Sequence, residues 1–237
     1  MSWTLGIDTS TAELGVGLAC HGQPVAACSR YVPNSHAEHL DSTIAFLLKS
    51  NALAPTAIER IGVAAGPGSF TGLRIGHAYV KGMFLGRPVP VLALSSLEVV
   101  ARALTETEDR DYAIAFDARR GDVYYAHFRR EAGTLVRRCE DTLAPVAQLA
   151  LEAGSGETVV CDTLGYARST IEELFNAHQV RTVAVEHLHV QRGLACALAA
   201  ATLPAQDTRW CTPCDLLPVY LRASAPEERL HSPEKRG

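Results

Sequence analysis

The expected order of strands and helices occurs twice along this chain of 237 residues. In each half, three strand-like segments come first, and alternating helices and strands follow. The N-terminal half has expected strands at Trp3–Asp8, Gly15–Cys20, Pro24–Tyr31, Arg60–Ala64 and Val89–Leu94, and expected helices at Ser35–Ser50, Thr71–Gly86 and from Ser95 onward. The C-terminal half has expected strands at Tyr112–Asp117, Asp122–Arg130, Thr134–Glu140, Thr158–Asp162 and Arg181–Glu186, and expected helices at Leu143–Glu152, Tyr166–Ala177 and His189–Leu203. A repeated order of eight elements predicts two copies of one lobe.

Three antiparallel strands followed by helix-connected parallel strands describe a ribonuclease H-like lobe. Two such lobes in tandem describe the α/β architecture that actin, Hsp70 and the sugar kinases share (the ASKHA fold). We expect the N-terminal lobe to span residues 1–107 and the C-terminal lobe residues 108–223, with a hinge in the charged stretch Thr105–Asp111. Residues 224–237 are rich in Pro, Glu, Arg and Lys, which predicts a disordered tail.

Composition narrows the class of function. The formal net charge of −4 argues against a stand-alone nucleic-acid binder, because such domains carry a basic face for phosphates. No leader segment is expected, and no apolar run approaches the roughly 20 residues that cross a bilayer. The seven cysteines fit free thiols in a reducing compartment. We therefore expect a cytoplasmic protein with no membrane contact.

Each lobe is expected to place an acidic turn after its first strand. In the first turn, Asp8, Thr9, Ser10 and Thr11 are candidates for binding a nucleotide or another anion, because hydroxyls and free amides donate to phosphate oxygens. The alternative is that these side chains bond only to their own turn. The second turn contains Asp117 and Arg119, also candidate anion ligands, but it lacks the glycines of a phosphate loop. Intrinsic ATP turnover is therefore not expected.

The string GPGSFTGLRIG, from Gly66 to Gly76, lies where a strand passes into a helix. Gly66 and Gly68 permit unusual backbone angles, and Ser69 can cap the helix. Exposed amides at the helix N-terminus predict an anion site. A tight turn without a ligand remains the alternative.

This string resembles the signature of the TsaB (YeaZ) family. Other segments agree with the resemblance: Ile7–Thr11, Lys81–Gly82, Asp117–Tyr124 and Pro218–Arg222. The agreement is weakest between about Thr134 and Pro213. The resemblance implies a non-catalytic scaffold or activator subunit, without a metal site, that pairs with the related subunit TsaD and with the ATPase TsaE to form N6-threonylcarbamoyladenosine at adenosine 37 of tRNA. No intrinsic cofactor is expected: the interface of the complex is the only place where ATP or ADP and Mg²⁺ could bind, and tRNA is reached only through the complex.

The expected helix Thr71–Gly86 contains four glycines, each of which costs roughly 1 kcal/mol relative to alanine in a helix interior. One apolar face can cover the sheet, and a second can meet TsaD or another copy of the chain. The predicted interface comprises Leu40, Ile44, Leu47, Gly72, Ile75, Gly76, Tyr79, Gly82, Met83 and Gly86. The alternative is a helix buried between layers of its own lobe.

Competing functions remain open from sequence alone. An active ATPase or phosphotransferase of the actin-like class is disfavoured by Arg119 and Arg120. A glycoprotease-like metallopeptidase is disfavoured because no HExxH motif or ligand triad is evident. His36 and His39 are interpreted as helix-start residues, and Cys211 and Cys214 as incidental thiols. The sequence does not decide between a monomer and a homodimer, or whether nucleotide binds.

Overall fold

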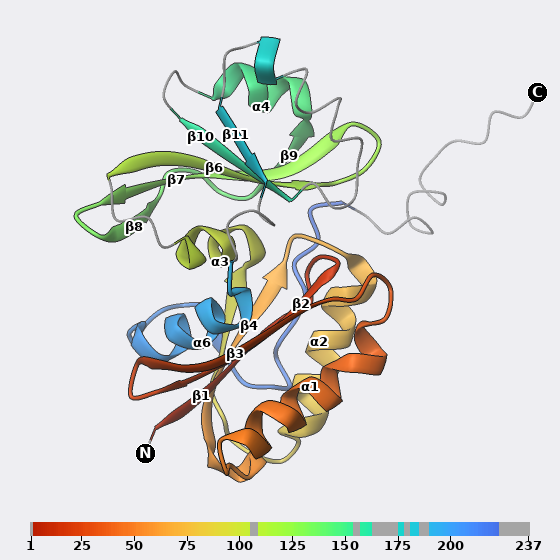
Figure 1. Ribbon diagram of the computed structural model, residues 1–237, viewed down its shortest axis with the longest axis vertical. Coiled ribbons are helices and arrows are strands. Elements are labelled where there is room, and N and C mark those ends of the chain that lie inside the picture. Colours follow the sequence, from red (N-terminus) through yellow and green to blue (C-terminus); the bar gives the residue numbers. More distant parts are fainter. Residues whose placement is uncertain are drawn as a thin grey trace, which may run out of the picture.

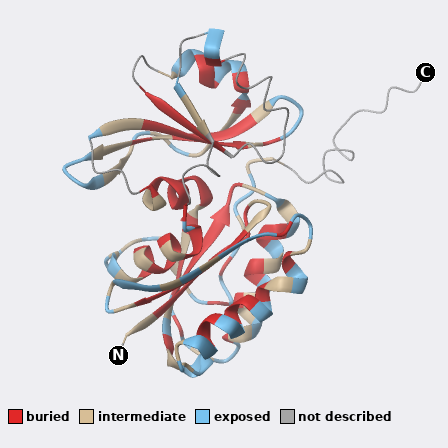
Figure 2. Ribbon diagram, in the orientation of Figure 1, coloured by how far each residue is buried: buried red, intermediate tan, exposed pale blue. Residues whose placement is uncertain are grey.

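The computed structural model describes residues 2–104, 109–153, 157–162, 175–177, 181–184 and 190–222. Two lobes lie one above the other in Figure 1, and each is built on a mixed sheet. The buried residues follow the inner strands of both sheets and the inward faces of the helices, whereas the edge strand Gln23–Tyr31 is largely exposed (Figure 2).

The first sheet has the strand order β12-β5-β4-β1-β2-β3 in the described residues. Strands β1, β2 and β3 are antiparallel, whereas β4 and β5 run parallel to β1. Helices α1 and α2 cover one face, where Leu40, Ile44 and Val80 join the core. The bounds are β1 (Trp3–Asp8), β2 (Glu13–Cys20), β3 (Gln23–Tyr31), α1 (His36–Ser50), a 3₁₀ turn (Pro55–Ala57), β4 (Ile58–Gly66), α2 (Phe70–Met83) and β5 (Val91–Ser95).

The second sheet repeats this arrangement, with the order β11-β10-β6-β7-β8 and β9 paired to β7. Strands β6, β7 and β8 are antiparallel, and β10 and β11 run parallel to β6. The bounds are β6 (Arg110–Asp117), β7 (Asp122–Glu131), β8 (Thr134–Arg137), β9 (Thr142–Pro145), α4 (Val146–Glu152), β10 (Thr158–Asp162) and β11 (Arg181–Ala184). The predicted repeat is confirmed: the chain forms two tandem ribonuclease H-like lobes of the ASKHA architecture.

The lobes exchange elements across the expected boundary near residue 107. Helix α6 (Arg192–Thr202) packs on β1, β2 and β4 of the first sheet, and β12 (Trp210–Cys211) pairs with β5. Helix α3 (Ser96–Ala103) lies between the sheets and adds Leu97 and Val100 to the core of the second lobe (Figure 1). The boundary therefore separates the first five strands from β6–β11, but it does not separate the helices.

Small residues let α6 lie directly against the first sheet. A Cβ atom on Gly6 would overlap the carbonyl oxygen of Gly193, and one on Gly62 would overlap that of Cys196. Both overlaps involve backbone atoms, which cannot move aside as a flexible side chain can. Glycine in these strands is therefore a requirement of helix-on-sheet packing.

One local prediction is wrong. Residues Leu143–Pro145 continue a strand, so α4 begins at Val146. At the start of α3, Ser95 Oγ accepts a bond from the Glu98 amide, and the Glu98 carboxylate contacts arginines. Most of the expected helix Tyr166–Ala177, part of the hinge and the tail 224–237 lie outside the described residues. No described helix combines the length and hydropathy that a membrane crossing requires.

Candidate functional site

The first acidic turn is buried and bonded to its own chain. Asp8, Thr9 and Ser10 are almost completely shielded from solvent. The Ser10 amide donates to Asp8 Oδ1 at 2.8 Å, and Thr9 Oγ1 donates to the Gly72 carbonyl at 2.8 Å. Asp8 Oδ2 and Ser10 Oγ have no hydrogen-bond partner in the described part of the chain. A ligand could reach them only after the covering segment had moved.

That covering segment is the predicted anion loop at the start of α2. The Ser69 amide donates to the Ser10 carbonyl at 2.6 Å, and Ser69 Oγ caps α2 by accepting from the Gly72 amide at 3.2 Å. A Cβ on Gly68 would overlap the Ser10 carbonyl oxygen, and one on Gly72 would overlap that of Thr9. These glycines therefore serve close approach to the chain's own first turn. Anion binding at this loop stays a prediction.

The second acidic turn differs in exposure and backbone conformation. Arg119, Arg120 and Gly121 are exposed and have φ angles of 65°, 60° and 85°. The Arg119 amide donates to Asp117 Oδ1 at 2.6 Å, which closes the turn. Two consecutive arginines in the left-handed region are unusual, because a Cβ disfavours that conformation. Neither turn offers an open glycine-lined cradle for the phosphates of a nucleotide.

The segment Pro218–Arg222 joins this second turn to the first lobe. The Val219 amide donates to the Ala65 carbonyl at 2.7 Å. Arg222 Nη1 donates to the Ala118 carbonyl at 2.8 Å, and Arg222 also forms an ion pair with Asp122. One of the segments that agrees with the TsaB pattern is therefore a strap between the lobes.

An aromatic cluster lies beside this strap. The rings of Phe70 and Tyr220 stack with centroids 4.5 Å apart. The Arg74 guanidinium lies 3.9 Å from the Phe70 centroid, and its Nε donates to the Tyr220 hydroxyl at 3.0 Å. Sequence reasoning did not assign a role to Phe70 or Arg74, because their contact with Tyr220 spans about 150 positions.

Arg192, at the start of α6, is a buried charged residue between the two turns that the sequence did not single out. Its side chain is fully buried, and Nη1 donates to Thr11 Oγ1 at 2.6 Å. The guanidinium also lies 5.4 Å from the ring centroid of Phe116, next to the second acidic turn. Arg192 therefore links the first turn to the last strand residues before the second.

The interface predicted on α1 and α2 is partly corrected. Leu40, Ile44 and Leu47 lie in the core, and Gly72 and Gly76 pack against Thr9, so these five residues face the chain's own sheet and first turn. The other five predicted residues remain at the surface, half-buried or exposed: Ile75, Tyr79, Gly82, Met83 and Gly86.

The Tyr79 hydroxyl donates to Asp41 Oδ1 at 2.9 Å and so ties α2 to α1. Burial and this bond raise the pKa of Tyr79. Phe46 on α1 and Leu85 after α2 are 62% and 77% exposed, and the sequence analysis missed both. Phe46 lies outside the helical spacing of the core leucines, which is the signal that could have identified it.

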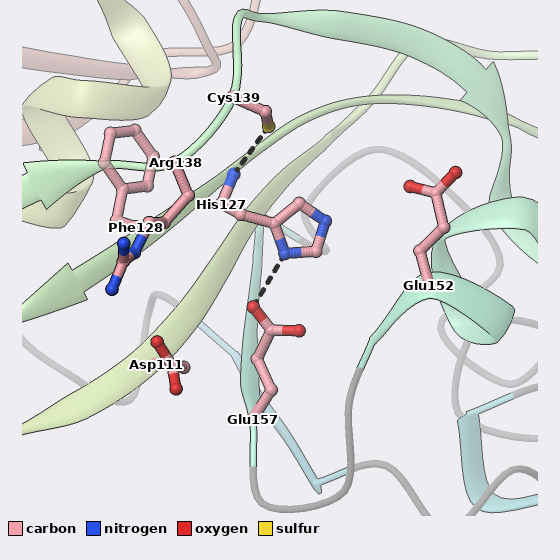
Figure 3. Close-up of a pocket in the computed structure, with 7 residues that line it drawn as sticks. All are labelled: Asp111, His127, Phe128, Arg138, Cys139, Glu152 and Glu157. Carbon is pink, nitrogen blue, oxygen red and sulfur yellow. Dashed lines mark hydrogen bonds and ion pairs between the residues drawn. The ribbon is translucent and has the colours of Figure 1, made fainter.

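A hollow of about 390 Å³ opens in the second lobe (Figure 3). His127 Nδ1 lies 2.7 Å from Glu157 Oε1, and this bond raises the pKa of His127. The His127 amide donates to Cys139 Sγ at 3.2 Å, and Glu152 accepts from Tyr125 at 2.7 Å. No group of three or more candidate metal ligands occurs among the described residues. The hollow therefore presents a histidine–carboxylate pair but no assembled metal site.

Comparison with known proteins places this geometry in a family. A family model described as "TsaD: tRNA N6-adenosine threonylcarbamoyltransferase" matches residues 30–176, more than half of the chain. The tRNA threonylcarbamoyladenosine biosynthesis protein TsaB of Bacillus subtilis is 36% identical over 131 residues, which cover 55% of this chain and 57% of that protein. TsaB of Escherichia coli is 32% identical over 128 residues, which cover 54% of this chain and 55% of that protein. The matched part thus spans about half the length of these curated relatives.

The likeness to solved structures extends further along the chain. YeaZ from Pseudomonas aeruginosa matches with a TM-score of 0.74 and 26% identity, covering 93% of this chain and 100% of that one. The two-lobed fold is therefore common to both proteins beyond the region of sequence similarity. This chain belongs to the family of the tRNA N6-adenosine threonylcarbamoyltransferase model and, within it, to the TsaB (YeaZ) group.

Proposed function

We propose that this chain is a non-catalytic subunit that pairs with TsaD, and with TsaE, in the formation of N6-threonylcarbamoyladenosine at adenosine 37 of tRNA. The observation that carries the proposal is the surface formed by the outer sides of α1 and α2. There Phe46 and Leu85 expose most of their side chains, and Ile75, Tyr79 and Met83 are half-buried. Helices α1 and α2 are neighbours, and exposed apolar side chains on neighbouring helices favour a protein interaction site.

The glycines of this surface fit the same role. A Cβ on Gly82 or Gly86 would have no heavy atom within 4 Å, so the fold of the described chain does not require glycine for space at either position. Gly82 nevertheless stands inside α2, where glycine costs roughly 1 kcal/mol relative to alanine. Close approach of a partner's backbone would explain its presence.

The two acidic turns support a non-catalytic role. The first is covered by α2, and the second carries arginine side chains where a phosphate loop needs free backbone amides. In this proposal, ATP or ADP and Mg²⁺ bind at the interface of the complex, and the assembly works in the cytoplasm.

The pairing is tested by mixing the purified chain with TsaD and following the complex by size-exclusion chromatography with light scattering. We expect Phe46→Asp and Gly82→Trp to abolish the complex while circular dichroism is unchanged. Leu151→Asp is the matched control, because Leu151 is 72% exposed on α4 of the other lobe. Equal binding by Phe46→Asp and Leu151→Asp would exclude this surface as the interface.

A homodimer through the same surface is a second candidate, favoured by the exposure of Phe46 and Leu85 in the isolated chain. Light scattering of the chain alone distinguishes the two. Both assemblies are supported if the chain alone is a dimer, if Phe46→Asp makes it a monomer, and if TsaD replaces one copy of the chain in the dimer. The non-catalytic role is tested by the ATP turnover of the chain alone, for which we expect the rate of a buffer blank.

A further inference from the structure

A surface rich in arginine and aromatic side chains lies where the strap joins the lobes. We define the arginine–aromatic surface by Phe70, Arg74, Arg119, Arg120, Tyr220 and Arg222. Two carboxylates, Asp117 and Asp122, belong to the same turn as Arg119 and Arg120. This part of the molecule thus holds four arginines and two carboxylates, one of which pairs with Arg222, whereas the whole chain carries a net charge of −4. Positive charge is concentrated here against the overall balance.

Side-chain contacts join most members of this surface into one unit. Tyr220 stacks on Phe70 and accepts from Arg74, both on the first turns of α2. Two residues later, Arg222 bonds to the carbonyls of Ala118 and Arg119 in the second acidic turn. The strap therefore holds a helix of one lobe and a turn of the other in a fixed relation.

The backbone of the turn favours a role for its arginines beyond folding. Arg119 and Arg120 both adopt left-handed angles, which glycine would adopt without strain. Strained residues of this kind concentrate at functional sites. Both side chains are exposed at the tip of the β6–β7 connection.

We infer that the arginine–aromatic surface binds RNA, with Arg119 and Arg120 on phosphates and Tyr220 as a stacking platform for an unpaired base. Single-stranded nucleic acid is held by this combination of guanidinium groups and aromatic faces. The inference rests on the proposed function, in which the substrate is a tRNA, and it assigns part of the tRNA contact to this chain. Arg74 lies one residue before Ile75 on α2, so RNA bound here would adjoin the proposed partner interface.

The test compares Arg119→Gly combined with Arg120→Gly against a charge-matched control, Arg30→Gln combined with Arg138→Gln. The control arginines are exposed on β3 and after β8, outside the arginine–aromatic surface. Glycine suits the left-handed turn, so the first variant removes charge without adding strain. Binding of an anticodon stem-loop RNA is measured by fluorescence anisotropy against salt, for the isolated chain at low ionic strength and for its complex with TsaD.

We expect the glycine variant to weaken binding and to reduce the slope of log affinity against log salt by about 1.4, which corresponds to two phosphate contacts on single-stranded RNA. We expect Tyr220→Ala to weaken binding about fivefold or more. The control should keep the parent slope. An unchanged slope in the glycine variant, or an equal loss in the control, would overturn the inference.

The isolated chain separates this inference from the proposed function. If the chain binds RNA through these residues but ignores TsaD, the RNA surface stands and the pairing fails. If TsaD binds and the glycine variant leaves RNA affinity unchanged in both settings, the pairing stands and the RNA surface fails. If the glycine variant loses TsaD but not RNA, the surface is a protein contact and the inference is wrong.

Discussion

The two acidic turns occupy equivalent places in the repeat, yet they have opposite environments. The first follows β1 and is shielded from solvent, and its Ser10 carbonyl accepts a hydrogen bond from the Ser69 amide. The second follows β6, is exposed at Arg119 and Arg120, and is fastened from outside by Arg222. One fold thus uses the same turn once as a packing surface and once as an external, charged loop.

The difference shows how a repeated lobe can diverge. Glycine in α2 brings the helix onto the first turn, and nothing equivalent covers the second turn in the described residues. The first turn should therefore tolerate changes of volume poorly, whereas the second should respond mainly to changes of charge and backbone preference. Four predictions test this comparison.

The largest effect is expected for Gly72→Ala. Alanine should favour the helix by about 1 kcal/mol, but its Cβ would overlap the Thr9 carbonyl oxygen. Because that oxygen belongs to a buried backbone, we expect a net loss of about 2 kcal/mol or more in the free energy of unfolding. Urea denaturation measures it. Gly82→Ala is the control and should gain up to about 1 kcal/mol; similar stability of the two variants would contradict a tightly packed first turn.

A smaller loss is expected for Arg222→Ala, which removes the external fastening of the second turn. Bonds from a charged donor contribute about 1.5–3 kcal/mol each when buried, but Arg222 and Asp122 are partly exposed. We expect a loss of about 1 kcal/mol, together with faster proteolysis next to Arg119. Arg222→Lys keeps the charge and loses the two-pronged geometry. A lysine variant that protects the turn as well as arginine does would reduce the strap to a simple ion pair.

Backbone preference in the second turn should give opposite signs at neighbouring positions. Gly121→Ala places a Cβ at φ 85° and should cost about 1 kcal/mol. Arg119→Gly relieves the same strain, but glycine also raises the conformational entropy of the unfolded chain. The net result should be a gain of about 0.5 kcal/mol in the free energy of unfolding. Thermal melting of both variants measures this. A loss on Arg119→Gly would mean that the arginine side chain itself stabilises the turn.

The smallest expected effect is a difference between the lobes in how stability depends on pH. Burial is the main cause that lowers the pKa of His36 beside the first turn, so the unfolded state binds more protons below about pH 6.5 and stability falls as pH falls. The bond to Glu157 raises the pKa of His127, so its contribution is present below pH 6.5 and is lost as pH rises through the folded value. The urea midpoint of the parent chain should fall as pH rises between pH 5 and pH 9 because His127 loses its proton. In His127→Gln, this decline at alkaline pH should be absent. His77, whose pKa burial also lowers, acts in the same direction as His36.

The order of strands was predictable from the sequence because apolar alternation and turn residues act locally. The position of α6 was not, since its alanine-rich face fits either sheet and the choice depends on glycines such as Gly6 and Gly62 far away in the chain. The start of α4 was misplaced because Leu143–Pro145 suits a strand that pairs with β7.

Less of the candidate site was predictable. Gly68 and Gly72 were interpreted through a ligand or a partner, because close approach to a phosphate, to another chain and to one's own backbone all select glycine. Thr9 and Ser10 were interpreted as candidate anion ligands in a turn, but their burial depends on α2, which is more than 60 positions away. Phe70, Arg74 and Tyr220 became a cluster only through tertiary contact.

The placement of α6 and β12 has a consequence for folding during synthesis on the ribosome. The first lobe cannot close when its own five strands have emerged, because the helix that covers β1, β2 and β4 ends only at Thr202 and the edge strand at Cys211. Until α6 has been synthesised, the glycine-lined apolar face of the first sheet is exposed to solvent. Contacts between residues so far apart in the sequence also form slowly. Nascent chains stopped before Arg192 should therefore bind holdase chaperones, and those released beyond Cys211 should escape them.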